Sequence, residues 1–178
     1  KPISFEVFSD EFNEMYEQAI KISKWGENVN VKIPISNTKG DSSKDLISSL
    51  AKEGVKLNIT AIFTLDQIEE AANFSKESPY TILSLFAGRI ADTGRDPEKI
   101  CKEAAKIKNS INPDGKLLWA SPREIYNIFQ AERSGCEIIT VAHNILSKIG
   151  NINKDLSTFS LETIKMFYDD AIDSGYKI

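Results

Sequence analysis

The chain has 178 residues, of which 41% are hydrophobic and 27% are charged, a composition typical of a folded globular domain and not of a disordered segment. The formal net charge of −4 argues against the clustered basic surface of nucleic-acid-binding proteins, so no nucleic-acid partner is expected. No apolar run approaches the roughly 18 residues that a membrane span needs, and no signal peptide is expected at the first residues. Any phosphate that this protein binds must therefore be met by a few local side chains.

The two cysteines, Cys101 and Cys136, have neither the spacing of a metal site nor the number of a disulfide framework. We interpret them as small apolar residues of a protein in a reducing compartment, and we expect a cytoplasmic protein without a bound metal. No Gly/Ser-rich linker, low-complexity tract or change of composition divides the sequence. Residues 1–178 are therefore predicted to form a single domain.

Short apolar runs rich in Val, Ile and Leu alternate along the chain with longer segments in which apolar residues recur three and four positions apart. The runs have the length of strands, and the segments have the period of amphipathic helices. The predicted strands are residues 3–8, 29–34, 55–63, 80–86, 116–120 and 137–142. The predicted helices are residues 10–25, 41–53, 64–77, 96–110, 121–134 and 161–175.

Two of the predicted helices begin with a capping sequence. Thr64 with Gln67, and Ser121 with Glu124, each have the S/T-x-x-E/Q spacing in which a hydroxyl and a carboxyl or amide group satisfy free N–H groups of the first turn. The spacing predicts helix starts at both places.

Proline and glycine agree with the same helix boundaries. Pro97 and Pro122 stand at predicted first helical positions, where a missing N–H costs nothing. Gly26, Gly54 and Gly135 follow predicted helices, where a left-handed C-terminal cap favours glycine. The boundaries therefore rest on local chemistry as well as on hydrophobic period.

The strict alternation of apolar strands and helices predicts an α/β protein with a parallel sheet covered by helices. A closed (β/α)8 barrel needs eight strands and about 250 residues, and this chain has six predicted strands. The residues leave two alternatives: an open doubly wound sheet, or a barrel whose first two units are not in this sequence. A Rossmann fold is disfavoured because no G-x-G-x-x-G follows a strand.

Polar residues stand at or just after the carboxyl ends of the predicted strands, where α/β proteins concentrate their chemistry. Such residues in apolar strands are costly unless they are paired, so their recurrence indicates a site. They are Glu6, Lys32, Asn58, Thr60, Ser84, Arg89, Ser121 and Arg123, together with the aromatic Phe86.

Lys32 lies inside an apolar strand. Desolvation and a neighbouring cation both favour the neutral form of a lysine, and a neutral amine can attack a ketone to form a Schiff base. The iminium then accepts the electrons of an adjacent carbon–carbon bond, so that aldol cleavage needs no metal or other cofactor. The alternative is a lysine at a strand end whose amine reaches solvent.

Five segments resemble, in order and approximate spacing, the strand-end motifs of the transaldolase family. They are FEVF at 5–8, VKIP at 31–34, LNIT at 57–60, SLFAGRIAD at 84–92 and ASPR at 120–123. The resemblance covers the chain from the family's third strand to its last helix, and it implies that the chain supplies strands 3 to 8 of a (β/α)8 TIM barrel. The family's first two strands, which carry an acid/base aspartate and an asparagine, have no counterpart here.

The resemblance implies transfer of a dihydroxyacetone unit between sugar phosphates. The implied donors are sedoheptulose 7-phosphate and fructose 6-phosphate, and the acceptors are glyceraldehyde 3-phosphate and erythrose 4-phosphate. By this similarity Lys32 is the Schiff-base residue, while Glu6 acts through a water that Thr60 holds. Asn58 and Ser84 bind substrate hydroxyls.

The same resemblance makes Arg89, Arg123 and Ser121 the phosphate-binding residues. An arginine fork suits a phosphate, and Ser121 is predicted at a helix N-terminus, where free N–H groups favour anions. Pro122 differs from the aromatic residue that the family often has there. Independently of the resemblance, Arg89 could instead pair with Asp92 in a solvated loop.

Three functional readings remain open at this point. A related enzyme, fructose-6-phosphate aldolase, typically has glutamine at the position of Glu6 and tyrosine at that of Phe86, a substrate-binding position, so both residues favour transaldolase. The third reading is a non-catalytic, sugar-phosphate-binding degenerate barrel, in which Glu6 pairs with Lys32 for structural reasons. The oligomeric state stays open, a homo-oligomer included. His143, the only histidine, is expected in a loop or helix-capping role.

Overall fold

The structure, a computed structural model, describes residues 1–177, and the chain divides into two compact units, residues 1–141 and a second unit that begins at Ala142. The strands are β1 (Ile3–Glu6), β2 (Val29–Pro34), β3 (Leu57–Ile62), β4 (Thr81–Leu85), β5 (Lys116–Trp119) and β6 (Ile138–Ile139). The helices of the first unit are α1 (Phe12–Ser23), α2 (Lys44–Lys52), α3 (Leu65–Ser75), α4 (Ala87–Ala91), α5 (Pro97–Ile111) and α6 (Tyr126–Arg133). The second unit contains α7 (His143–Leu146), the 3₁₀ helix η1 (Ile149–Asn151) and α8 (Leu156–Asp173).

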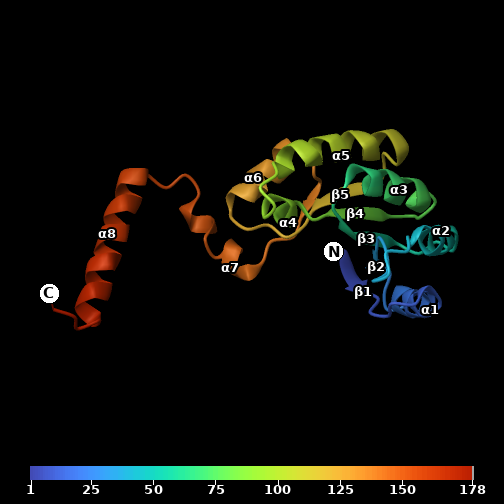
Figure 1. Cartoon of the computed structure of the whole chain (residues 1–178), viewed down its shortest axis with the longest axis horizontal. Helices are drawn as coiled ribbons and strands as arrows, with labels where there is room; N and C mark the ends of the chain where they lie inside the picture. Colours follow the sequence, from blue (N-terminus) through green and yellow to red (C-terminus); the bar gives the residue numbers. More distant parts are fainter. Residues whose placement is uncertain (178) are drawn as a thin grey trace. The chain divides into compact units, whose positions relative to one another are not determined.

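The first unit is built on a curled parallel sheet whose strand order is β1-β2-β3-β4-β5-β6, so each strand pairs with its neighbour in the sequence (Figure 1). This confirms the predicted parallel sheet of alternating strands and helices. The open doubly wound alternative is wrong, because such a sheet reverses its strand order at a switch point. The consecutive order is that of a partial β/α barrel.

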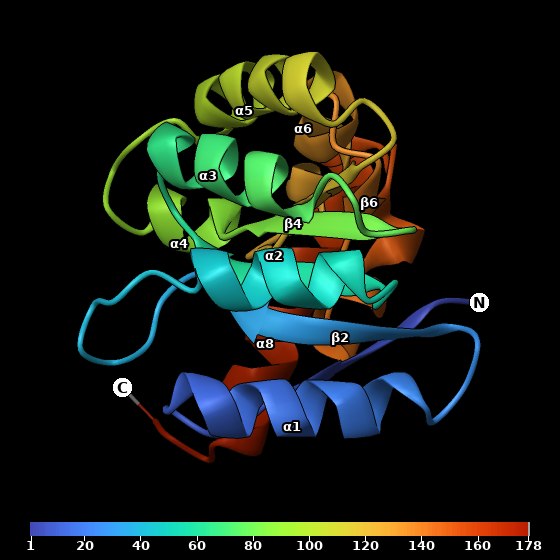
Figure 2. The same ribbon diagram turned by 90° about the vertical axis from the view of Figure 1, so that its right-hand side faces the viewer.

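Helices cover one face of this sheet. Figure 2 shows α1, α2, α3 and α5 following one another around the outside of the strands. The strand residues that face them are apolar and fully buried, and each helix presents residues spaced three and four apart. The buried residues of the two layers include Val31, Ile33, Leu57, Ile59, Leu83, Leu85, Leu117 and Trp119 from the strands, and Met15, Ala19, Ile47, Leu50, Ile68, Ala72, Cys101 and Ala104 from the helices.

The other face of the same strands is partly polar. Because side chains alternate along a strand, the residues between the core positions point away from the helices. Glu6, Lys32 and Asn58 share one register row, and Ser84 and Leu118 pair further along the sheet. The predicted polar positions are therefore gathered on the inner face, opposite the main core.

Most of the predicted helix boundaries are confirmed. Thr64 accepts the N–H of Gln67 in a complete capping box, and Asp96 caps α5 with Pro97 in its first turn. The glycines after α2 and α6 have φ of 77° and 82°, as a left-handed cap requires. Gly26 was wrongly predicted to be such a cap, because α1 ends at Ser23 in right-handed turns closed by i to i+3 bonds.

The capping box predicted at Ser121 and Glu124 is wrong. α6 begins four residues after Pro122, which is therefore not its first residue. The side chain of Asn127 accepts the backbone N–H groups of Arg123, at 2.6 Å, and of Glu124, at 3.1 Å. An amide inside the helix thus takes the capping role that the sequence assigned to the serine.

A bulge interrupts β3 at Ala61, a non-glycine residue with φ of 59°. Ile59 pairs with Leu83, and the next pair is Ile62 with Leu85, so β3 carries one extra residue over this interval. The extra residue returns Ile62 to the core, where it is fully buried, and leaves Thr60 on the inner face.

Strand 137–142 is shorter than predicted. β6 has two residues, although the bonds from Glu137 N to Leu117 O and from Thr140 N to Trp119 O extend its pairing with β5 by one position at each end. The short helices α4, α7 and η1 were not predicted, and His143 is the first residue of α7.

The second unit ends in α8, which begins five residues before the predicted position 161. Asp155 caps this helix by accepting the N–H of Thr158 at 2.8 Å, a cap that was not predicted from the sequence. Within residues 1–177, no helix has the length and apolar character to cross a membrane.

Candidate functional site

A pocket of about 800 Å³ runs along the inner face of the sheet. Its walls combine apolar side chains of β4, β5 and β6 with polar groups from neighbouring strand ends, an arrangement usual for small-molecule sites. Six of the nine predicted site residues line it: Lys32, Asn58, Thr60, Ser84, Phe86 and Ser121. The apolar wall includes Ile82, Leu118 and Ile138.

Glu6 and Lys32 form an ion pair across the first two strands. They are register partners of β1 and β2, and the Lys32 Nζ lies 3.0 Å from Glu6 Oε2. The exposed fractions of the two side chains are 29% for Lys32 and 47% for Glu6. Lys32 was expected to be shielded from water beside a cation, whereas it is half-buried and its partner is a carboxylate. A carboxylate at this distance can exchange protons with the amine directly or through one water.

Asn58 stands in the middle of a hydrogen-bonded chain on the inner face. Its Nδ2 donates to Ser4 Oγ at 3.0 Å, and its Oδ1 accepts from Ser84 Oγ at 2.7 Å. Asn58 and Ser84 are buried. The chain fixes the orientation of the amide next to Lys32.

Ser4 was not among the predicted site residues. It stands two positions before Glu6, on the same face of β1, so the two-residue period of the strand was the signal that could have identified it.

Thr60 is 2% exposed, and its Oγ1 has no hydrogen-bond partner among the described residues. A buried hydroxyl without a partner costs roughly 1–3 kcal/mol, so Thr60 Oγ1, at the wall of the pocket, is available to bond a ligand group or a water molecule. The neighbouring Ala61 holds a left-handed backbone conformation, which is the kind of local strain found at functional sites.

An aromatic stack supports Arg89 at the carboxyl end of the sheet. The Arg89 guanidinium carbon lies 5.4 Å from the centroid of the Phe86 ring, and the Phe63 ring lies 5.5 Å from the same ring. Arg89 itself is exposed and does not line the pocket, but the ring that it covers does. Sequence reasoning missed Phe63, because the bulge at Ala61 decides which way the end of β3 faces.

The loops after β4 and β5 are in direct contact. Gly88 N donates to Ala120 O at 3.1 Å, and a Cβ built on Gly88 would lie 1.5 Å from Ser121 O. Ser121 has φ of 58° and lies on the pocket wall, in a loop. Its predicted place at a helix N-terminus is wrong, so helix N–H groups do not support an anion there.

Arg123 pairs with Asp92, which joins the same two loops. Arg123 Nε donates to Asp92 Oδ1 at 3.2 Å, and Nη2 donates to Oδ2. The hydrogen bonds from Arg123 lower the pKa of Asp92, and those to Asp92 raise the pKa of Arg123. The sequence suggested Arg89 as the partner of Asp92, whereas the fold gives that place to Arg123.

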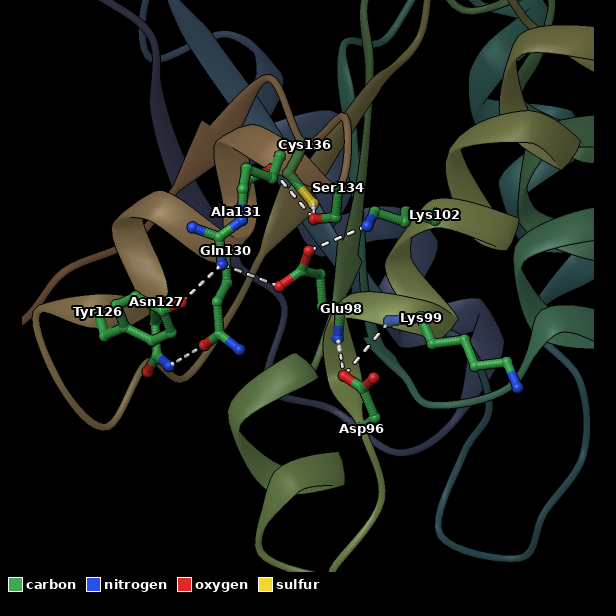
Figure 3. A network of polar contacts seen from close by, with 11 residues as sticks. Asp96, Glu98, Lys99, Lys102, Tyr126, Asn127, Gln130, Ala131, Ser134 and Cys136 are labelled. Atoms are coloured by element: carbon green, nitrogen blue, oxygen red, sulfur yellow. Dashed lines mark hydrogen bonds and ion pairs between the residues drawn. The ribbon is translucent and has the colours of Figure 1, made fainter.

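Behind these loops, polar contacts join α5 to α6 (Figure 3). Glu98 accepts from Lys102 and from Arg133, each at 3.0 Å. Hydrogen bonds first from Arg133 and then from Lys102 lower the pKa of Glu98. This pairing holds the helix that follows the Arg123 loop against α5.

A further ion pair lies at the amino ends of β5 and β6. The buried Nζ of Lys108 lies 2.8 Å from Glu137 Oε1 and donates to Gly115 O, while Glu137 Oε2 accepts from Leu117 N at 2.7 Å. This pair lies outside the pocket lining and connects α5 to the last two strands.

Comparison with known proteins gives a consistent picture. A family model described as "Transaldolase/Fructose-6-phosphate aldolase" matches residues 1–177. The chain is 31% identical over 177 residues to a "Probable transaldolase" of Thermoanaerobacter sp. (strain X514), which covers 99% of this chain and 76% of that protein. It is 32% identical over 148 residues to a "Probable transaldolase 2" of Listeria monocytogenes, covering 83% of this chain and 64% of that protein. It is 29% identical over 150 residues to a "Probable transaldolase" of Methanococcus maripaludis, covering 84% and 66%.

Proposed function

The chain belongs to the transaldolase/fructose-6-phosphate aldolase family, and on this premise we propose that it transfers a dihydroxyacetone unit between sugar phosphates through a Schiff base on Lys32. The observation that carries the proposal is the position of the Lys32 amine: it lines the pocket and is paired with Glu6 at 3.0 Å. The donors would be sedoheptulose 7-phosphate or fructose 6-phosphate, and the acceptors glyceraldehyde 3-phosphate or erythrose 4-phosphate.

The proposed reaction begins when the neutral amine of Lys32 adds to the ketone carbon of the donor. Glu6 donates a proton to the carbinolamine hydroxyl, which leaves as water and produces the iminium. The hydroxyl of Thr60, which lacks a partner among the described residues, would hold the water on its way in or out.

Carbon–carbon cleavage follows from the iminium. The electrons of the bond between C3 and C4 move into the iminium to form an enamine, the C4 hydroxyl loses its proton, and the aldehyde half departs. The enamine then adds to the acceptor aldehyde, and hydrolysis frees Lys32. The hydrogen-bonded pair of Asn58 and Ser84 would bind the donor hydroxyls.

The proton of the C4 hydroxyl goes, in this family, to an aspartate of the first strand. We propose that β1 to β6 correspond to strands 3 to 8 of the (β/α)8 barrel, which leaves that strand outside the 178 residues. The chain spans 64% to 76% of the length of the relatives described above. The transaldolase activity of the whole protein is therefore proposed from its family and its site residues.

The phosphate of the substrate would lie at the mouth of the pocket against Arg89 and Arg123, with Ser121 beside them. An arginine presents a planar fork of N–H donors that suits phosphate oxygens. Phe86 lines the pocket, and its ring also lies against the Arg89 guanidinium. Phe86 and Glu6 both favour the transferase over the related aldolase.

Borohydride reduction in the presence of fructose 6-phosphate, followed by peptide mapping, tests the proposal. We expect a covalent adduct on Lys32, and none in a Lys32→Arg variant, because a guanidinium stays protonated and cannot form the imine. Lys39→Arg, at an exposed lysine outside the pocket, is the matched control and should retain the adduct. An adduct at another lysine would contradict the role of Lys32. No adduct at all would contradict the Schiff-base mechanism and favour a non-catalytic binding domain.

The choice between the two enzyme activities needs a second assay. A transaldolase should release glyceraldehyde 3-phosphate from fructose 6-phosphate only when erythrose 4-phosphate is supplied as acceptor. Release without an acceptor would show the aldolase activity instead.

A further inference from the structure

The two arginines proposed to bind phosphate have different surroundings. Arg89 lies over the Phe86 ring. Arg123 is held by a two-pronged ion pair with Asp92, through Nε and Nη2. A carboxylate repels phosphate. The presence of Asp92 beside an arginine proposed to bind phosphate therefore has to be explained.

Both members of the pair are fixed through their backbones. Asp92 caps α4 through its N–H to Gly88 O at 3.1 Å, and Gly88 N is bonded to Ala120 O. The backbone N–H of Arg123 donates to the side chain of Asn127 at 2.6 Å. The backbones of both residues are therefore held in place, and the Asp92 carboxylate lies where it can orient the guanidinium.

The pair leaves donors free. A guanidinium has five N–H groups, and Asp92 takes one on Nε and one on Nη2, so three remain for another anion. The side chains of Arg123 and Asp92 are 50% and 52% exposed, so a ligand at the surface can reach them. An ion pair this exposed contributes little to folding stability, which argues against a purely structural role.

The local charge also attracts a phosphate group, which is negative at neutral pH. With Arg89 and Arg123 positive and Asp92 negative, the three side chains sum to one positive charge. Both arginines act on Asp92, because the charge of Arg89 also contributes to lowering its pKa. The carboxylate therefore stays ionised at neutral pH and remains paired with Arg123.

We propose that Asp92 is a positioning residue for phosphate binding: it holds the Arg123 guanidinium so that its free N–H groups face the phosphate of the substrate. This inference rests on the proposed function, in which Arg123 binds that phosphate. Without Asp92 the long arginine side chain would have to be ordered when the substrate binds. Ordering one such side chain weakens binding by about three- to tenfold.

The test compares Asp92→Asn and Asp92→Ala with the wild-type protein. We expect KM for fructose 6-phosphate to rise by about three- to tenfold in the two variants, most in Asp92→Ala, with kcat nearly unchanged. Borohydride trapping of Lys32 with dihydroxyacetone, which has no phosphate, should not change. Glu11→Gln, which breaks another exposed ion pair, with Lys39, should leave KM as in the wild type.

A double-mutant cycle separates positioning from a general structural effect. In an Arg123→Gln background, Asp92→Asn should have no further effect on KM. If Asp92→Asn raises KM by the same factor in that background, the proposal is overturned. It is also overturned if Asp92→Asn weakens borohydride trapping with dihydroxyacetone to the same extent. A fall in KM also overturns it, because Asp92 would then compete with the phosphate.

Binding of inorganic phosphate, measured by calorimetry, tests Asp92 without any catalytic step. The dissociation constant should rise in Asp92→Asn and not in Glu11→Gln. If Lys32 forms no adduct but this difference is found, the proposed function fails and the role of Asp92 stands. If the wild-type protein binds phosphate no better than Asp92→Asn, the role of Asp92 fails.

Discussion

A Cβ on Gly88 would lie 1.5 Å from the carbonyl oxygen of Ser121, so the loops after β4 and β5 fit together only if residue 88 has no side chain. The two loops carry both arginines of the candidate site. Their contact therefore links a packing requirement to the geometry of phosphate binding.

We predict that Gly88→Ala is destabilising by about 2–3 kcal/mol, because the obstructing atom belongs to the backbone and the loop must move. KM for a phosphorylated donor should rise in the same variant. Urea unfolding and steady-state kinetics measure the two effects. Gly150→Ala is the control, since a Cβ added at Gly150 would have nothing within 4 Å and its stability should change little. An unchanged stability of Gly88→Ala would show that the loops are not held together by this contact.

Thr60→Val should separate stability from activity. The Oγ1 of Thr60 has no partner among residues 1–177, so replacing it with a methyl group should keep or raise the free energy of unfolding. The rate of imine formation should fall by about 10- to 100-fold if the hydroxyl holds the water. Thr60→Ser, which keeps the hydroxyl, should retain most of the activity. A fully active Thr60→Val variant would remove Thr60 from the mechanism.

Ala61→Gly should stabilise the protein. Ala61 has φ of 59°, a conformation that costs an L-residue roughly 1–2 kcal/mol, and part of this is recovered with glycine despite its larger entropy in the unfolded chain. We expect a gain of about 0.5 kcal/mol in urea unfolding. Ala61→Val, with a branched side chain, should lower stability, and the opposite order of the two variants would contradict the strain.

Because of the ion pair between Lys108 and Glu137, the free energy of unfolding should depend on pH in the acidic range. Burial alone raises the pKa of Glu137, but the hydrogen bonds from Lys108 and from Leu117 N outweigh it, so the pKa is lowered overall. A carboxyl whose folded pKa is depressed stabilises the fold above its unfolded pKa, about 4.3, and this stability is lost as the pH falls through the folded value.

Glu137→Gln should therefore be less stable than the wild type at pH 7, by about 1–2 kcal/mol after allowance for solvent screening of the partly exposed carboxylate. The difference should shrink as the pH falls below about 4.3. Urea unfolding at several pH values measures it. A difference that stays constant from pH 7 to pH 3 would contradict the role of the ion pair.

The strand and helix pattern was predictable because the elements have a clear hydrophobic period, and because Thr64, Pro97, Gly54 and Gly135 mark helix boundaries. Lys32, Asn58 and Ser84 were found because polar residues in apolar strands are rare, and the parallel register brings them to one face. The consecutive order of the strands, in contrast, depends on which helices cover which face, and the two sheet alternatives had equal local patterns.

The errors of sequence reasoning fall where tertiary contacts decide the local structure. The loop that holds Ser121 is shaped by Gly88 and by the side chain of Asn127. Neither residue belongs to the S/T-x-x-E/Q sequence from which a cap was predicted. The partner of Asp92 depends on how two loops meet in space. The bulge at Ala61 had no glycine to mark it, so the direction of Phe63, which follows the bulge, could not be assigned beforehand.

The sheet order has a consequence for how the protein is made. Every strand from β2 to β6 pairs with the strand made just before it, so each unit finds its partner already present when it leaves the ribosome. Contacts between segments close in the sequence form quickly, and a chain with this order can fold as it is translated. No strand among these six waits for a distant one to be synthesised, which shortens the time in which its apolar residues stay exposed to other nascent chains.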